Sequence, residues 1–94
     1  MYEIYMKACH LTIKGKVQGV YFRQSAKQKA FELNITGWVR NNPDNIVEIF
    51  AQGNEENMHV FIAWCHQGPP AARVSAVIVT ETAADNSSSF IIIR

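Results

Sequence analysis

The amino-acid sequence predicts an α+β fold, a ferredoxin-like α/β sandwich in which one antiparallel sheet carries two helices on one of its faces. The chain has 94 residues, enough for one small domain with a single core, which we expect to span residues 1–94. Strand-like and helix-like patterns follow one another in the order β-α-β-β-α-β, with a short extra strand. Right-handed crossovers then place both helices on the same side of the sheet.

The first expected elements are a strand and a helix joined by a short loop. Residues 9–14 alternate apolar and polar side chains, which is the period of a half-buried strand. A glycine-bounded loop over residues 15–19 interrupts this pattern. From Phe22 onward apolar residues recur at helical spacing, and we expect the helix to end at Asn34, a residue type that tolerates the left-handed conformation at a helix end.

The rest of the chain continues this alternation. Turn-forming residues at 41–45 (NNPDN) predict a hairpin between two strand-like segments. Asn54 followed by two glutamates predicts the start of a second helix, and Gly68 followed by two prolines predicts its end. The strands expected in this part of the chain are residues 37–40, 46–51, 73–80 and 90–94.

Composition and charge disfavour several classes of function. Nine lysines and arginines stand against eight acidic residues, whereas dedicated nucleic-acid binders and polybasic membrane binders carry a basic excess. No apolar run is long enough to span a membrane, and the N-terminus lacks the pattern of a secretory signal. We therefore expect a soluble cytoplasmic monomer with neither nucleic-acid nor membrane partners.

The cysteines and histidines predict neither a metal site nor another cofactor. Cys9 and Cys65 are far apart in the sequence and fall on predicted inward faces, so buried reduced thiols are the favoured interpretation and a disulfide the alternative. The three histidines include no pair at the i,i+4 spacing of a zinc site. We expect these side chains on solvated faces; they are His10, His59 and His66.

The most informative segment is residues 15–23 (GKVQGVYFR), where the first strand leads into the first helix. The helix start has no Ser, Thr, Asp or Asn to cap it, so its first backbone amides lack an acceptor. Arg23 lies in the first turn, where a cation opposes the helix dipole. An oxyanion held by the amides and the guanidinium would explain both features. A solvated Arg23 with water-capped amides is an equally open alternative.

Asn41 is the second candidate, at the end of the strand before the turn. An asparagine in such a turn usually bonds its own backbone, and this interpretation favours a structural role. If the strand end lies beside the loop at residues 15–19, the amide side chain would instead hold a water molecule next to the anion.

Together these segments resemble the signatures of the acylphosphatase family. Residues 15–23 are similar to its first motif, and residues 37–41 (GWVRN), with Val47 and Gly53 at the expected offsets, to its second. Residues 68–74 resemble the stretch that leads to the family's fourth strand. The resemblance covers nearly the whole chain. It implies an enzyme that hydrolyses the carboxyl-phosphate bond of acyl phosphates to a carboxylate and inorganic phosphate.

The resemblance also implies which residues carry the reaction. Arg23 matches the family's phosphate-binding arginine, and Asn41 matches the asparagine that positions the attacking water. Inorganic phosphate would act as product and inhibitor, with no metal or other cofactor. The backbone amides that would form the phosphate cradle belong to Gln18, Gly19, Val20, Tyr21, Phe22 and Arg23.

Two positions and the last two residues depart from the family pattern. Asn45 replaces a glycine after the hairpin aspartate, and Asn34 stands where glycine often closes the first helix, so we expect left-handed backbone at both. The chain ends in Ile93 and Arg94, which leaves the packing of the last strand near the site open.

Two other classes of function occur on this fold. RNA readers stack bases on paired aromatic residues of the open sheet face, and this chain lacks that pairing in the first and third strands. An interaction module of a larger protein is disfavoured by the intact Arg23 and Asn41. The side chains expected to point outward from those two strands are Thr12, Lys14, Glu48 and Phe50.

Overall fold

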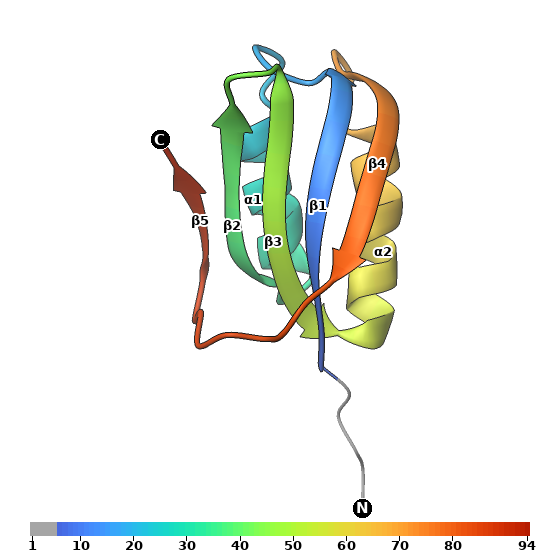
Figure 1. Cartoon of the computed structure of the whole chain (residues 1–94). Coiled ribbons are helices and arrows are strands. Elements are labelled where there is room, and N and C mark those ends of the chain that lie inside the picture. Colours follow the sequence, from blue (N-terminus) through green and yellow to red (C-terminus); the bar gives the residue numbers. More distant parts are fainter. Residues whose placement is uncertain (1–5) are drawn as a thin grey trace, which may run out of the picture.

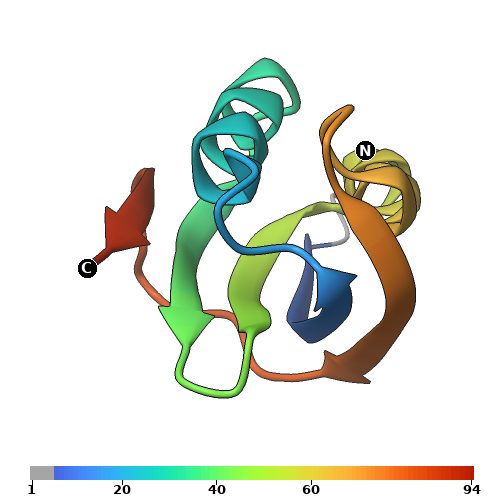
Figure 2. The same cartoon turned by 90° about the horizontal axis from the view of Figure 1, so that it is seen from above.

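The computed structural model describes residues 6–94 as a five-stranded sheet with two helices on one face (Figures 1 and 2). This arrangement confirms the predicted ferredoxin-like class and the predicted order of elements. The elements are β1 (Met6–Lys16), α1 (Phe22–Glu32), β2 (Thr36–Asn42), β3 (Ile46–Asn54), α2 (Glu55–Gln67), β4 (Arg73–Glu81) and β5 (Phe90–Ile93).

The strands lie in the order β4-β1-β3-β2-β5. The four longer strands pair antiparallel, as the sequence predicts. β5 joins the free edge of β2 in parallel, with Gly37 opposite Phe90, so the complete sheet is mixed. The segment after β4 passes across one end of the sheet to reach that far edge, and β5 then runs in the same direction as β2 (Figure 1). This pairing closes off one side of β2.

The core lies between the sheet and the helices. Leu11 and Ile13 of β1 are fully buried, which confirms the two-residue period of that strand. Phe22 of α1 and Phe61 of α2 are the largest fully buried side chains. The ring of Phe61 also meets that of Phe90 on β5, with centroids 6.0 Å apart, so the last strand is attached to the same core.

The two cysteines are buried and free, as the favoured interpretation predicts. Burial raises the pKa of the Cys65 thiol, and it likewise raises that of Cys9.

Neither described helix has an apolar stretch long enough to cross a lipid bilayer.

The two helices begin in different ways. Asn54 caps α2, because its Oδ1 accepts a hydrogen bond from the Asn57 backbone amide at 2.8 Å, and Glu55 and Glu56 occupy the first turn as predicted. α1 begins after Tyr21 with no side-chain cap and no acidic residue in its first turn. The fold therefore leaves one helix start completed and the other incomplete.

Gly37 explains why the second motif begins with glycine. Its φ is 138°, and a Cβ there would collide with the backbone carbonyl of Phe50 on β3. Glycine permits both the backbone angle and the close approach of the two strands. β2 is thereby seated against β3 a few residues before the second candidate, Asn41.

The expected left-handed asparagines are confirmed, with φ of 60° at Asn45 and 54° at Asn34. Replacing Asn45 by Gly relieves backbone strain but adds unfolded-state entropy, so we expect the free energy of unfolding to change by less than about 1 kcal/mol. Asn45→Val should lower it by about 1–2 kcal/mol, because a β-branched residue tolerates positive φ poorly. Denaturant titrations of both variants test this, and equal stabilities for Gly and Val would contradict it.

Candidate active site

A cavity of about 320 Å³ opens at one end of the sheet. Figures 1 and 2 show that the loop between β1 and α1, the β2–β3 turn and the end of β5 all lie toward this end. The predicted residues Arg23 and Asn41 both line the cavity. Of the residues predicted to form the cradle, those that also line it are Gly19, Tyr21, Phe22 and Arg23.

The start of α1 supplies a set of unpartnered backbone donors. The first bond of this helix runs from the Ser25 amide to the Tyr21 carbonyl at 3.0 Å. The amides of Phe22, Arg23 and Gln24 precede it and have no acceptor within the helix. Because Tyr21 provides no side-chain cap, these donors point out of the helix end, where its dipole is positive. This is the uncapped start that the sequence predicts.

The loop backbone is held in an uncommon conformation. Gly19 and Tyr21 have φ of 73° and 63°, on either side of Val20, whose side chain is buried. A Cβ built on Gly19 meets no atom within 4 Å, so its backbone borders open space. A left-handed tyrosine carries strain, and such strained residues are concentrated at functional sites. Its side chain is 81% exposed at the cavity mouth.

Arg23 projects from the first turn of α1 into the lining of this cavity. No carboxylate of the described residues forms an ion pair with it. A cation at this end of a helix is unfavourable by itself, because it adds to the positive pole. The guanidinium and the amides are therefore both available to the same anion.

Asn41 lies on β2, on the sheet face that carries the helices, since Val39 two residues earlier is fully buried in the core. Its Oδ1 is buried and has no hydrogen-bond partner among the described residues. One interpretation of the sequence is that the Asn41 side chain bonds the backbone of its own turn. The structure shows no such bond at Oδ1. An unsatisfied buried acceptor is costly, so this oxygen is available to a donor such as a water molecule.

The side chain of Gln18 ties the loop to the hairpin, a role that the sequence analysis missed. Its Nε2 donates to the carbonyl of Asn42 at 2.7 Å and to that of Ile46 at 3.1 Å. These two residues face each other where β2 ends and β3 begins. The tether thus sets the separation between the loop amides and Asn41. No local pattern indicates these partners, which lie 24 and 28 residues away.

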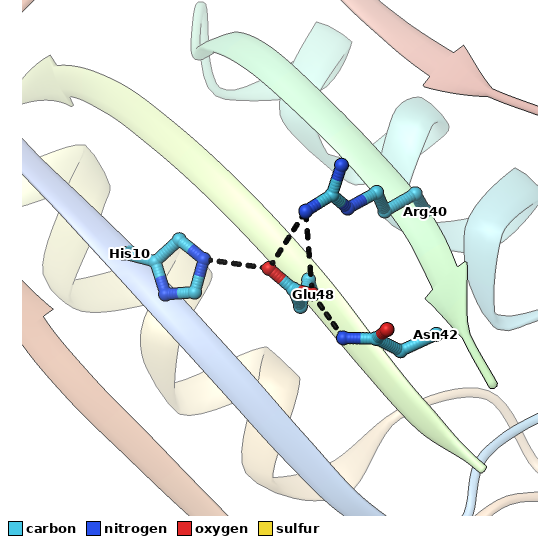
Figure 3. Close-up of polar contacts among 4 residues, drawn as sticks. All are labelled: His10, Arg40, Asn42 and Glu48. Carbon is cyan, nitrogen blue, oxygen red and sulfur yellow. Dashed lines mark hydrogen bonds and ion pairs between the residues drawn. The ribbon is translucent and has the colours of Figure 1, made fainter. Parts of the chain in front are cut away.

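A second cluster holds the strand around Asn41 from the opposite face of the sheet (Figure 3). Arg40 and Asn42, the neighbours of Asn41, both donate to the carboxylate of Glu48 on β3. His10 on β1 approaches the same carboxylate with an Nε2–Oε2 distance of 2.9 Å. His10 lies on the open face of the sheet with its side chain 37% exposed, as expected from the sequence, and it also forms this specific contact, which the sequence does not predict.

Among residues 6–94, the open face of the sheet offers no pair of exposed stacking rings. Trp38 is only partly exposed, and the Arg40 guanidinium lies 5.0 Å from its ring centroid. Phe50 is buried beside it. This arrangement agrees with the sequence-based argument against an RNA reader.

Four further lining residues were not predicted as site residues from the sequence, namely Val17, Gln24, Ile92 and Arg94. The last two reach the cavity because β5 pairs with β2, a contact between distant segments. The lining contains no Asp, Glu, His or Lys. In the part of the chain that the structure describes, no group of three or more His, Cys, Asp or Glu residues is arranged to hold a metal ion. The cavity is suited to binding an oxyanion with a water molecule beside it.

Comparison with known proteins points to one family. A family model described as acylphosphatase matches residues 9–92. The acylphosphatase of Methylococcus capsulatus is 47% identical over 90 residues, which cover 95% of this chain and 98% of that protein. The solved acylphosphatase from Coxiella burnetii is 38% identical with a TM-score of 0.93, covering 99% of this chain and all of that one. The acylphosphatase structure from Bacillus subtilis is 31% identical with a TM-score of 0.91, covering 96% and 100%.

The Glu48 cluster predicts a pH dependence of stability. Burial raises the pKa of Glu48, but the hydrogen bonds from His10 and Arg40 outweigh burial and hold this pKa below its usual value. A lowered pKa in the folded state stabilises the protein above the unfolded-state pKa of about 4.3 and ceases to do so as the pH falls through the folded-state value. Glu48→Gln should therefore lower the free energy of unfolding by about 1 kcal/mol at pH 7.

This deficit should shrink below about pH 4, where wild type loses the same contribution. Urea titrations from pH 3 to 7 measure it. Glu81→Gln is the matched control, because that exposed carboxylate pairs with Lys7 at the far end of the sheet and not with the Glu48 cluster. A Glu48→Gln deficit that stayed constant over this range would contradict the assignment.

Proposed function

Because this chain belongs to the acylphosphatase family, and so hydrolyses acyl phosphates to a carboxylate and inorganic phosphate, we propose that Arg23 and Asn41 divide the work of this reaction in the cavity. Arg23 and the loop amides bind the phosphoryl group, and Asn41 positions the attacking water. The observation that carries the proposal is the buried, unpartnered Oδ1 of Asn41 in the same cavity as the unpaired guanidinium of Arg23.

Phosphoryl binding rests on three kinds of donor that converge without competition from an acidic side chain. The amides at the α1 N-terminus point along the positive end of the helix dipole. The proposed cradle extends along the loop through the amides from Gln18 to Arg23, next to the open space at Gly19. The planar guanidinium of Arg23 is able to contact two phosphoryl oxygens at once. These donors stabilise the charge on the equatorial oxygens as the transition state forms.

Water positioning follows from the chemistry of the amide oxygen. Oδ1 of Asn41 is an acceptor, so a water molecule donates one hydrogen to it and presents a lone pair elsewhere. Held beside the bound phosphoryl group, that lone pair faces phosphorus. The site thereby converts a bimolecular attack into a step between groups already in place.

The remaining chemistry demands little of the protein. A bond forms between the water oxygen and phosphorus while the bond from phosphorus to the acyl oxygen breaks. The leaving group is a stable carboxylate that needs little protonation, and phosphoryl transfer depends mainly on positioning and charge stabilisation. Because no Asp, Glu, His or Lys lines the cavity, a phosphoryl oxygen of the substrate accepts the proton from water.

We also propose that the chain works as a single-domain monomer in the cytoplasm, without a metal ion. Its two free cysteines are compatible with a reducing compartment. Inorganic phosphate should compete with substrate, because product and substrate share the same cradle.

The two residues should fail differently when replaced. Arg23→Ala should raise both KM and the inhibition constant of phosphate, because it removes a charge that contacts substrate and product alike. Arg23→Lys should restore little, since an ammonium cannot reproduce two-point contact. Asn41→Ala should lower kcat by roughly 10²–10³-fold, the scale of losing one positioning group, and spare phosphate binding.

Steady-state kinetics with acetyl phosphate and phosphate as inhibitor measure both effects, and circular dichroism controls for folding. Lys27→Ala is the matched control, because this exposed lysine lies on α1 about one turn beyond Arg23 and does not line the cavity. Collapse of phosphate binding in a folded Asn41→Ala variant would show that the proposed division of roles is wrong.

A further inference from the structure

Arg94 follows the last residue of β5, and the register of that strand places it beside Asn41. The parallel pairing with β2 matches Val39 with Ile92 and Arg40 with Ile93. Arg94 lies just beyond β5, and extending the same register by one step would set it opposite Asn41. Neighbouring strands lie about 4.8 Å apart, so the two residues are close in space.

The side chain of Arg94 lies on the helix-bearing face of the sheet. Phe90 is buried and contacts Phe61 of α2, and Ile92 packs against the same core, so alternate residues of β5 point toward the helices. Arg94 continues this alternation on the face that also carries Asn41. Its presence in the cavity lining agrees with that placement.

Two guanidinium groups thus face one small cavity that has no acidic side chain in its lining. Neither Arg23 nor Arg94 forms an ion pair with a described residue. Two like charges near each other are unfavourable unless an anion lies between them. The phosphoryl group of an acyl phosphate carries close to two negative charges at neutral pH, and one guanidinium neutralises only one of them.

We propose that Arg94 is a second phosphoryl-binding residue, approaching the group from the side of Asn41 while Arg23 approaches from α1. This inference rests on the proposed function and adds to it a ligand contact from the end of β5. In an in-line displacement the leaving group departs from the side opposite the attacking water. Because Arg94 is adjacent to the residue that holds the water, it faces phosphoryl oxygens and not the departing acyl group.

The test compares Arg94→Gln with wild type, using inorganic phosphate as the binding probe and acetyl phosphate as substrate. We expect the inhibition constant of phosphate and the KM of acetyl phosphate to rise together by about tenfold, the scale of one partly exposed charge-assisted hydrogen bond. Arg94→Lys should recover part of the loss. Lys27→Gln removes an equal charge from α1 outside the cavity, and it should change neither constant.

Three outcomes would overturn the assignment. Unchanged phosphate binding in Arg94→Gln would show that the guanidinium does not contact the phosphoryl group. If Lys27→Gln weakened phosphate binding as much as Arg94→Gln does, the loss would come from the change in net charge and not from a contact made by Arg94. Succinyl phosphate, whose acyl group bears a carboxylate, serves as a second substrate. If Arg94→Gln raised the KM of succinyl phosphate alone, Arg94 would contact the acyl group instead.

An Arg23→Ala arm separates this inference from the proposed function. If Arg23→Ala weakens phosphate binding and Arg94→Gln does not, the second contact is wrong and the proposed site stands. If neither variant weakens phosphate binding, the proposed phosphoryl site is itself wrong, and the assignment of Arg94 fails with it.

Discussion

The incomplete start of α1 is the constraint around which this molecule is built. Three backbone amides and the guanidinium of Arg23 gather at the positive pole of the helix, and no described side chain caps or neutralises them. α2 shows that the same chain completes a helix start when function does not require otherwise, since Asn54 caps it. In the proposed function, a bound anion offsets the free-energy cost of this uncapped helix start.

The remainder of the fold holds the other groups of the proposed site at fixed positions around the α1 start. Gln18 ties the loop to the hairpin by hydrogen bonds. On the far side of the sheet, Glu48 accepts hydrogen bonds from Arg40 and Asn42, the two neighbours of Asn41. β5 closes the edge of β2 and brings Arg94 to the cavity. A reaction that needs mainly positioning and charge stabilisation is well served by a small rigid sheet, because neither requirement calls for a cofactor or a moving lid.

Local patterns in the sequence predict most of this architecture, and contacts between distant segments account for what they miss. The alternation of β1, the Asn54 cap and the left-handed Asn45 follow from residue types and spacing. The candidate site is predictable from the sequence because an uncapped helix start with an arginine is a local pattern and resembles a family motif. Strand order and register, which no single segment encodes, determine the contacts that the sequence does not predict. These are the hydrogen bonds from Gln18, the His10–Glu48 contact and the position of Arg94 at the cavity.

A phosphate titration followed by ¹⁵N NMR tests the central claim most directly. If the loop and the start of α1 form the cradle, the amide signals of residues 18–23 and the side-chain amide of Asn41 should shift saturably. Their midpoint should equal the inhibition constant of phosphate measured in the hydrolysis assay. Phosphate binding that leaves the loop amides unchanged, with shifts confined to another surface, would contradict the account.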